Sequence, residues 1–253
     1  MAYVKVKDLW LSYPVIVNAG SVRRAIMNTL LGGFTRPSEE QKDIVMVDAI
    51  RGISFELKDG DKLGIIGHNG AGKTSLLKVL ASIYPPTHGT VEVDGHVESF
   101  LATGFGLESE ETGRENIKFV LTMLGKSPQT VKHDTEEIAD FTELGEFLDL
   151  PVRTYSAGMR ARLSFAIATN IRPEILVMDE VIGAGDIRFK EKAQERIQEI
   201  AQHTKIIVLA THSEGLIKKW CNKAIWIEQG KVRDIGAPEE LWERYKKSMI
   251  SGK

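Results

Sequence analysis

The sequence predicts an α/β fold in which a sheet of alternating strands and helices is interrupted by a helical module. Three observations support this. Short apolar runs alternate with segments of helical spacing in the second half of the chain, a glycine-rich loop follows one such run, and residues 112–150 show helical spacing throughout. The 253 residues are enough for one large α/β domain or two small ones.

Composition narrows the class of protein. The chain is 42% hydrophobic and 27% charged, which is typical of a soluble globular protein, and its net charge of −2 provides no overall positive field for nucleic acid or an anionic lipid surface. The single cysteine, Cys221, cannot form an intramolecular disulfide and favours a reducing compartment. No apolar run approaches the ~18 residues that span a bilayer, and Lys5, Lys7 and Asp8 are unlike a signal peptide. We therefore expect a cytosolic protein with no nucleic-acid partner and no direct membrane span.

The N-terminal part predicts two strands that flank an insert. Residues 2–13 and 50–57 alternate polar and apolar side chains, as half-buried strands do. Residues 14–48 form the insert, in which Val22, Ile26 and Leu30 have helical spacing before a Gly32-Gly33 stop. A short amphipathic helix followed by a loop fits this pattern. Its apolar face either packs on its own domain or contacts a partner protein, and the sequence leaves both open.

The glycine-rich loop is the most informative motif. Gly67-His68-Asn69-Gly70-Ala71-Gly72-Lys73-Thr74 follows the apolar run 63–66 and precedes a helical pattern of Leu76, Leu77, Leu80 and Ile83 that ends at Pro85-Pro86. Such a loop turns several backbone N–H groups toward one anion at the positive end of a helix. Lys73 then reaches the β- and γ-phosphates of a nucleotide, and the Thr74 hydroxyl ligates Mg²⁺. The sequence therefore predicts a phosphate-binding loop.

The remaining elements follow in order. Residues 89–93 and 97–101 read as strands around an Asp94-Gly95 turn, and Ser127 is an N-cap before a proline at the first helical position. Later strands are expected at 175–178, 206–210 and 224–227, with a helix carrying Phe189, Ala193, Ile197 and Ile200, and a last helix from Pro238.

Two carboxylates follow the apolar strand 175–178. Asp179 and Glu180 lie at its carboxyl end, where α/β folds place their ligands. The two carboxylates can have different roles: Asp179 holds Mg²⁺, directly or through water, and Glu180 orients and deprotonates the attacking water. Solvated surface carboxylates are the alternative, but the apolar run before them and the phosphate loop elsewhere favour a catalytic role.

Ser156 caps a further helix, and at this point the order of motifs resembles the nucleotide-binding subunit of ABC transporters. The phosphate loop resembles Walker A, Ser156-x-Gly158 the signature motif, Asp179-Glu180 Walker B, Gly185-Asp186 the D-loop, and His212 the H-loop. The resemblance covers essentially the whole chain. It implies a P-loop ABC-ATPase fold with a RecA-like core sheet, an antiparallel β subdomain and an inserted helical subdomain.

The resemblance also implies partners and site residues. Two copies would pair head to tail, each ATP lying between one copy's phosphate loop and the other's Ser156 and Gly158, with a separate transmembrane permease as third component. The implied catalytic residues are Glu180, His212 and Lys73; the nucleotide-binding residues are Tyr13, Gly67, Asn69, Gly70, Ala71, Gly72, Lys73, Thr74, Ser75, Ser156, Gly158 and Asp186; and the metal ligands are Thr74, Asp179 and Glu108. Tyr13 resembles the aromatic that stacks on adenine, although an ordinary strand-end tyrosine is the alternative.

Two positions depart from the family pattern. Ala157 replaces a glycine of the signature, and Glu108 stands where a glutamine is expected. An ionised glutamate accepts but does not donate hydrogen bonds. At ~6 Å from a phosphate oxygen and an effective dielectric of ~20, its charge costs on the order of 3 kcal/mol. Either Mg²⁺ or a proton offsets this charge, or the true position is one residue away.

Within the family, the string Thr112-Gly113-Arg114-Glu115-Asn116 resembles the polysaccharide-export branch, in a short form without a carbohydrate-binding domain. This implies an ATPase that drives export of a lipid-linked polysaccharide of the O-antigen type from the cytoplasmic face of the bacterial inner membrane. Capsule or teichoic-acid export, or a soluble ABC ATPase, are the alternatives. We expect one nucleotide-binding domain over 1–253, with the core and β subdomain at 1–103 and 160–235, the helical subdomain at 104–159 and a C-terminal helix at 236–253.

Overall fold

The computed structural model describes residues 1–16, 34–37, 44–100, 106–179 and 187–251. They divide into two compact units. Unit 1 comprises Met1–Leu101, Glu174–Glu180 and Lys205–Lys253, and unit 2 comprises Ala102–Pro173 and Val181–Thr204. Each unit has its own apolar core.

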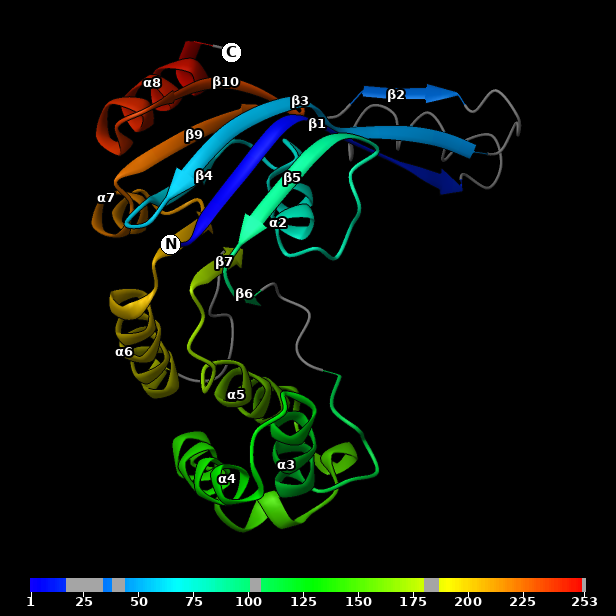
Figure 1. The fold of residues 1–253 in the computed structure, drawn as a ribbon, viewed down its shortest axis with the longest axis vertical. Helices are drawn as coiled ribbons and strands as arrows, with labels where there is room; N and C mark the ends of the chain where they lie inside the picture. The colour runs from blue at the N-terminus through cyan, green and yellow to red at the C-terminus, as the bar shows by residue number, and fades with distance from the viewer. Residues whose placement is uncertain (17–33, 38–43, 101–105, 180–186, 252–253) are drawn as a thin grey trace. The chain divides into compact units, whose positions relative to one another are not determined.

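An antiparallel sheet forms one layer of unit 1. Its strands are β1 (Tyr3–Ile16), β2 (Phe34–Pro37), β3 (Ile44–Lys58) and β5 (His88–Asp94), in the order β2-β3-β1-β5. The far ends of β1 and β3 project together with β2 beyond the other strands (Figure 1).

The predicted insert at 14–48 was partly wrong. β1 and β3 run well into this range, and β2 adds a strand where a loop was expected. The physical reason is that the strand pattern continues: Val45 and Val47 are buried on β3 and pair with Val15 and Tyr13 of β1. The helix predicted around Val22–Leu31 lies outside the described residues.

The second sheet of unit 1 is six-stranded, with the order β10-β9-β4-β8-β7-β6. Its strands are β4 (Lys62–Ile66), β6 (Val97–Phe100), β7 (Ile175–Asp179), β8 (Ile206–Ala210), β9 (Lys223–Glu228) and β10 (Lys231–Gly236). β9 through β6 are parallel, and β10 is an antiparallel edge strand that the sequence analysis missed. Every residue of β8 is buried, as expected of a central parallel strand.

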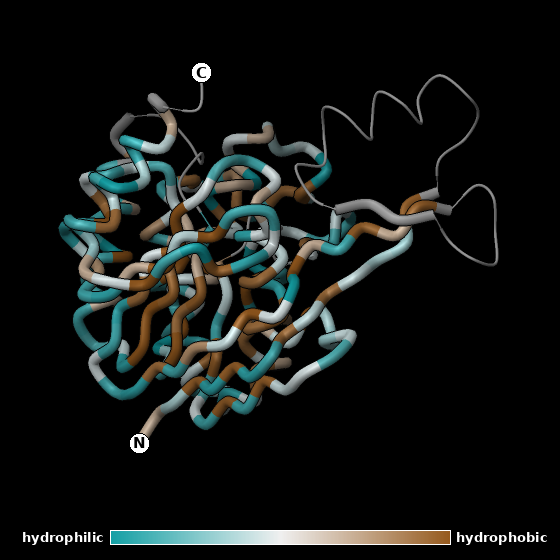
Figure 2. Tube along the Cα trace, turned by 90° about the horizontal axis from the view of Figure 1, so that it is seen from above, coloured by the Kyte–Doolittle hydropathy of each residue, from teal (hydrophilic) through white to brown (hydrophobic). Residues whose placement is uncertain are grey.

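The core of unit 1 lies between the two sheets. Leu9, Ile50 and Ile53 of the antiparallel sheet belong to one apolar cluster with Ile65 and Val208 of the parallel sheet, and all five are fully buried. In Figure 2 the strands inside the trace are largely brown, whereas turns and outer segments are largely teal. Buried apolar area of this kind provides most of the folding free energy, at roughly 25 cal/mol per Å².

Three helices of unit 1 are α2 (Lys73–Leu80), α7 (Glu214–Trp220) and α8 (Pro238–Ser251). α8 packs against β9 through Trp226, Trp242 and Tyr245, whose rings meet edge to face. α7 lies close against β4: a Cβ atom at Gly64 would sit 2.5 Å from Ile217 Cδ1 and 3.1 Å from Cys221 Sγ. Burial in this contact raises the pKa of the Cys221 thiol to about 12.

α2 ends earlier than predicted. The sequence predicts a helix that continues to Pro85-Pro86 with Ile83 on its apolar face, but the helix ends at Leu80 and Ile83 is 47% exposed. Ser82 adopts a left-handed conformation with φ of 57°, which a continuing helix does not allow. The amides of Ile83 and Tyr84 both donate to the Lys78 carbonyl, which closes the helix instead.

Unit 2 is helical. It contains α3 (Gly113–Met123), α4 (Pro128–Thr142), the 3₁₀ turns η2 (Gly145–Asp149) and η3 (Val152–Thr154), α5 (Ala157–Ala168) and α6 (Ile187–His203). The predicted N-cap at Ser127 is confirmed, because its hydroxyl accepts the Thr130 N–H. The helical spacing predicted up to residue 150 does not give a regular helix after Thr142, because Gly145–Asp149 and Val152–Thr154 form 3₁₀ turns. The unit extends past the expected limit at residue 159, because Phe165 of α5 and Phe189 of α6 pack on Phe141 of α4.

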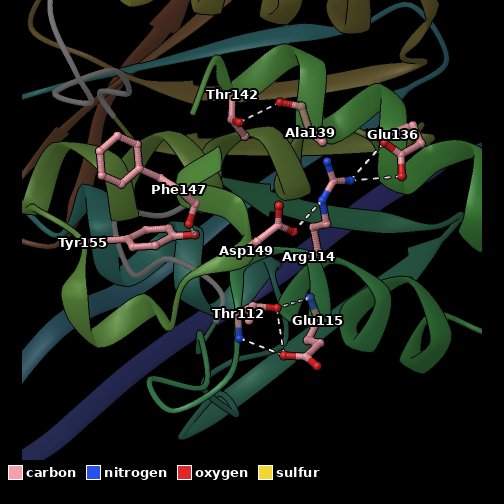
Figure 3. Close-up of polar contacts among 9 residues, drawn as sticks. All are labelled: Thr112, Arg114, Glu115, Glu136, Ala139, Thr142, Phe147, Asp149 and Tyr155. Carbon is pink, nitrogen blue, oxygen red and sulfur yellow. Dashed lines mark hydrogen bonds and ion pairs between the residues drawn. The ribbon is translucent and has the colours of Figure 1, made fainter. Parts of the chain in front are cut away.

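The start of α3 is held by polar contacts (Figure 3). Thr112 and Glu115 form a reciprocal capping box, and the two bonds from Thr112 lower the pKa of the Glu115 carboxyl. Arg114 donates to both carboxylate oxygens of Glu136 on α4 and to Asp149 of η2. One guanidinium therefore links three elements of unit 2.

The packing of α3 gives a stability prediction. Leu121 is fully buried in the core of unit 2, whereas Met123 on the same helix is 73% exposed. Leu121→Ala should lower the free energy of unfolding by roughly 2–5 kcal/mol through lost burial and a cavity. Met123→Ala is the matched control and should change it by no more than about 0.5 kcal/mol. Urea unfolding followed by far-ultraviolet circular dichroism measures both, and equal effects of the two variants would contradict the assigned core.

Candidate functional site

Three adjacent parallel strands of unit 1 deliver the predicted residues to one edge of the sheet. β8 lies between β4 and β7, and Asp179 at the end of β7 is in register with Ala210 at the end of β8. His212 follows two residues later, and the loop 67–72 follows β4. Parallel strands all end at the same edge, so residues far apart in sequence meet there.

The loop 67–72 approaches neighbouring backbone too closely for side chains at two of its glycines. A Cβ atom at Gly67 would lie 2.3 Å from the Ile227 carbonyl oxygen, and one at Gly72 would lie 2.5 Å from the Ala49 carbonyl oxygen. Gly72 also has φ of 106°, which residues with a side chain rarely adopt. These two positions fix the loop against β9 and β3 and set the start of α2.

Lys73 lies beneath this loop and is only 8% exposed. Its Nζ donates to the carbonyl oxygens of Gly67 at 2.8 Å and His68 at 3.0 Å, and lies 3.3 Å from His212 Nε2. An ammonium can only donate, so in this contact the His212 Nε2 is placed as the acceptor. The cation is thus held against the carbonyl oxygens of the loop.

Thr74 and Asp179 provide a pair of oxygen ligands. The Thr74 hydroxyl donates to Asp179 Oδ2 at 2.5 Å, so the two oxygens already converge on one point. A hydroxyl and a carboxylate are hard donors that suit Mg²⁺, which is usually bound by one or two protein ligands plus water and phosphate oxygens. The residues present therefore fit the predicted metal.

Nine of the predicted residues line one pocket of about 330 Å³ in unit 1, whereas Gly67 does not line it. It contains Tyr13, Asn69, Gly70, Gly72, Lys73, Thr74, Ser75, Asp179 and His212. Val47 and Ala49 of β3 also line it, although neither was predicted from the sequence. Val47 is in register with Tyr13 across β1 and β3, so continuing the strand pattern of β3 to residue 44 would have found it.

Other predicted residues lie elsewhere. The side chain of Ala71 is buried in the core of unit 1, and its backbone binds His68 and Gly230. Glu108, Ser156 and Gly158 belong to unit 2, where the Ser156 hydroxyl accepts the Met159 N–H and caps α5 as predicted. Glu180 and Asp186 lie outside the described residues, so their roles stay predictions.

The pocket has the chemistry of a polyphosphate site. Within the described residues, no side chain caps the N-terminus of α2, so its first N–H groups are left for an anion. Lys73 adds a positive charge, His212 a ring nitrogen, and Thr74 with Asp179 a cation site. The apolar side chains of Tyr13, Val47 and Ala49 form a wall that suits a flat base.

Comparisons with known proteins agree with this chemistry. Residues 50–183 match the family described as ABC transporter. The O-antigen export system ATP-binding protein RfbE of Yersinia enterocolitica is 44% identical over 227 residues, which cover 89% of this chain and 94% of that protein. The corresponding protein RfbB of Myxococcus xanthus and the teichoic acids export ATP-binding protein TagH of Lactococcus lactis are each 40% identical, over 85% and 83% of this chain. The chain spans about half the length of these two longer relatives, at 49% and 44%.

Solved structures show the same fold. The dimeric post-hydrolysis structure of the ATP-binding cassette MJ0796 bound to ADP and Pi has a TM-score of 0.68 at 20% identity, covering 93% of this chain and 98% of that one. A structure described as the ATP binding subunit of an ABC transporter has a TM-score of 0.69 at 18% identity. The predicted P-loop ABC-ATPase fold is therefore confirmed. With the family match over residues 50–183 and 44% identity to a relative that it covers almost completely, this chain belongs to the ABC transporter family.

Proposed function

We propose that the chain is the ATP-hydrolysing subunit of a polysaccharide exporter. The observation that carries the proposal is the pocket that brings together Asn69, Gly70 and Gly72 of the loop with Lys73, Thr74, Asp179 and His212. Within it, Lys73 and the first N–H groups of α2 bind the phosphates, and Tyr13 contacts the base. The ABC transporter family supports ATP as the nucleotide.

Magnesium and Glu180 complete the proposed chemistry. Thr74 and Asp179 would hold Mg²⁺, which when bound offsets negative charge on the phosphate oxygens. Glu180 directly follows Asp179 in the sequence and would orient and deprotonate the attacking water. His212 would contact the terminal phosphate once this phosphate has drawn Lys73 away from the ring nitrogen.

A second copy of the chain is the proposed partner across the nucleotide. Ser156 and Gly158 at the start of α5 would contact the terminal phosphate bound to the other copy, and Asp186 would lie at the same interface. Hydrogen-bond donors on both sides of one phosphate favour the pair while that phosphate is present. Hydrolysis removes it, so the pair separates. Dimeric cassette structures of the same fold support this arrangement.

Export through a separate permease is the proposed output. None of the described helices combines the length and apolar character that crossing a bilayer requires. We infer that the chain binds a transmembrane permease at the cytoplasmic face of the inner membrane, as expected for relatives named as export ATP-binding proteins. O-antigen is the favoured cargo, since RfbE matches at 44% identity; the 40% identity to TagH makes teichoic acid the second candidate.

Replacing Lys73 tests nucleotide binding. Lys73→Ala should weaken binding of a non-hydrolysable ATP analogue by roughly 10- to 100-fold, because a charged hydrogen bond contributes about 1.5–3 kcal/mol. Lys78→Ala is the matched control, since Lys78 lies on the same helix and its Nζ stands 5.1 Å from the Tyr84 ring, away from the pocket. Calorimetry with Mg²⁺ measures both, and equal affinities in the two variants would contradict the assigned phosphate site.

Replacing Glu180 tests the catalytic base. Glu180→Gln should lower kcat for ATP hydrolysis by roughly 10²- to 10⁴-fold, because the amide cannot take a proton from water. ATP should still bind, so dimers should accumulate on a sizing column run with MgATP. Glu195→Gln on α6 removes the same charge from an exposed position and is the control. Turnover that is unchanged in Glu180→Gln would rule out this residue as the base.

Purification from membranes tests the exporter proposal. The tagged Glu180→Gln variant, expressed in its native host, should purify from detergent-solubilised membranes with a multi-span membrane protein and a glycolipid. Mass spectrometry of both identifies the permease and the sugar repeat. Recovery with ribosomes or a DNA-repair complex instead would overturn export while leaving ATP hydrolysis intact.

A further inference from the structure

The pocket of unit 1 has two sides that come from different parts of the fold. Asn69, Gly70 and Gly72 belong to the loop after β4, whereas Val47 and Ala49 belong to β3 of the antiparallel sheet. A nucleotide whose phosphates lie at the loop and whose base lies at β3 contacts both sides at once. Its affinity therefore depends on the spacing between the two sides, because one ligand of fixed length has to reach both.

The turn between β9 and β10 is bonded to both the loop and β3. It consists of Gln229 and Gly230, whose φ angles of 49° and 75° are those of a two-residue hairpin turn. The Gly230 N–H donates to the Ala71 carbonyl oxygen of the loop at 2.9 Å, and the Gly230 carbonyl oxygen accepts the Arg51 N–H of β3 at 2.8 Å. The two backbone groups of one residue therefore join segments that are distant in the sequence.

The junction of the turn, the loop and β3 is tightly packed. A Cβ atom at Gly230 would lie 2.8 Å from the Ala49 carbonyl oxygen. A Cβ atom at Gly72 would lie 2.5 Å from the same oxygen and 3.6 Å from the Gly230 Cα. All three segments thus meet at the carbonyl group of a residue that itself lines the pocket. A closely packed junction transmits displacement, so a shift of the turn moves the two sides relative to each other.

The side chain of Arg51 holds the turn from the β3 side. Its Nε–H donates to the Gln229 carbonyl oxygen at 3.1 Å, and its Cγ lies 3.4 Å from where a Cβ atom of Gly230 would be. Arg51 is half-buried and lies outside the pocket lining. Replacing it would weaken the junction without introducing a clash and without removing a group that touches the ligand.

We propose that Gly230 and Arg51 are positioning residues for the nucleotide, because the turn that they hold sets the spacing between the loop that binds the phosphates and the β3 wall that contacts the base. The inference rests on the proposed function. Weakening the junction should lower the affinity for ATP, which needs both sides of the pocket. It should spare tripolyphosphate, which has no base and needs only the loop side.

Calorimetry with Mg²⁺ and these two kinds of ligand tests the inference. Gly230→Ala should weaken binding of a non-hydrolysable ATP analogue by about 10-fold or more, because the new Cβ displaces the Ala49 carbonyl and the positive φ becomes strained. Binding of tripolyphosphate should stay within about twofold of the parent. Arg51→Ala should weaken the analogue by about 3- to 10-fold through one lost hydrogen bond, and it serves if Gly230→Ala folds poorly.

A control separates positioning from backbone strain. Gly60 of unit 1 also has a positive φ, 88°, but a Cβ atom there would have no described atom within 4 Å. Gly60→Ala should therefore leave both affinities within about twofold of the parent. Equal losses for the two ligands in Gly230→Ala and Arg51→Ala, unchanged affinities in both, or an equal loss of the analogue in Gly60→Ala would overturn the inference. A parent protein that binds neither ligand would instead overturn the proposed function.

Discussion

The site depends on two backbone contacts that leave no room for a side chain. The carbonyl oxygens of Ile227 and Ala49 stand where Cβ atoms of Gly67 and Gly72 would be, so the loop lies directly on β9 and β3. That position sets the start of α2 and places Lys73 under the loop, with its Nζ on the Gly67 and His68 carbonyls. Any larger residue at either glycine would move the loop, and with it the cation and the N–H groups that we propose bind the phosphates.

The order of the parallel strands then assembles the rest of the pocket. Because β8 lies between β4 and β7, the loop after β4, His212 after β8 and Asp179 at the end of β7 reach the same edge. Lys73 already contacts His212 there, and Thr74 already contacts Asp179. A bound polyphosphate and its metal would replace these contacts between side chains with contacts to phosphate oxygens and to the metal. The side chains are therefore already close together before binding, so less has to be ordered when the ligand binds.

Much of this could be predicted from the sequence, because glycine, lysine and carboxylate patterns are local. The loop, Asp179 and the caps at Ser127 and Ser156 were placed correctly for that reason. The features that could not be predicted depend on contacts between segments that are distant in the sequence. The pairing of β1 with β3 as far as Ile44 was not evident, so Val47 and Ala49 were overlooked as pocket residues. Ile83 fitted the helical spacing, yet a left-handed Ser82 ended α2 first. Likewise, nothing in the sequence shows that Gly230 bonds to Ala71.

The packing of α7 on β4 has a practical consequence. Cys221 is the only cysteine of the chain, and its sulfur lies against Gly64 with a pKa of about 12. At neutral pH it stays a thiol and not the nucleophilic thiolate, so alkylating reagents react with it slowly. The native Cys221 is therefore expected to stay largely unlabelled when thiol reagents are used on this protein. A single cysteine introduced on each unit would carry a spin label or fluorophore, and distances between the units could be followed through a nucleotide cycle without first removing the native residue.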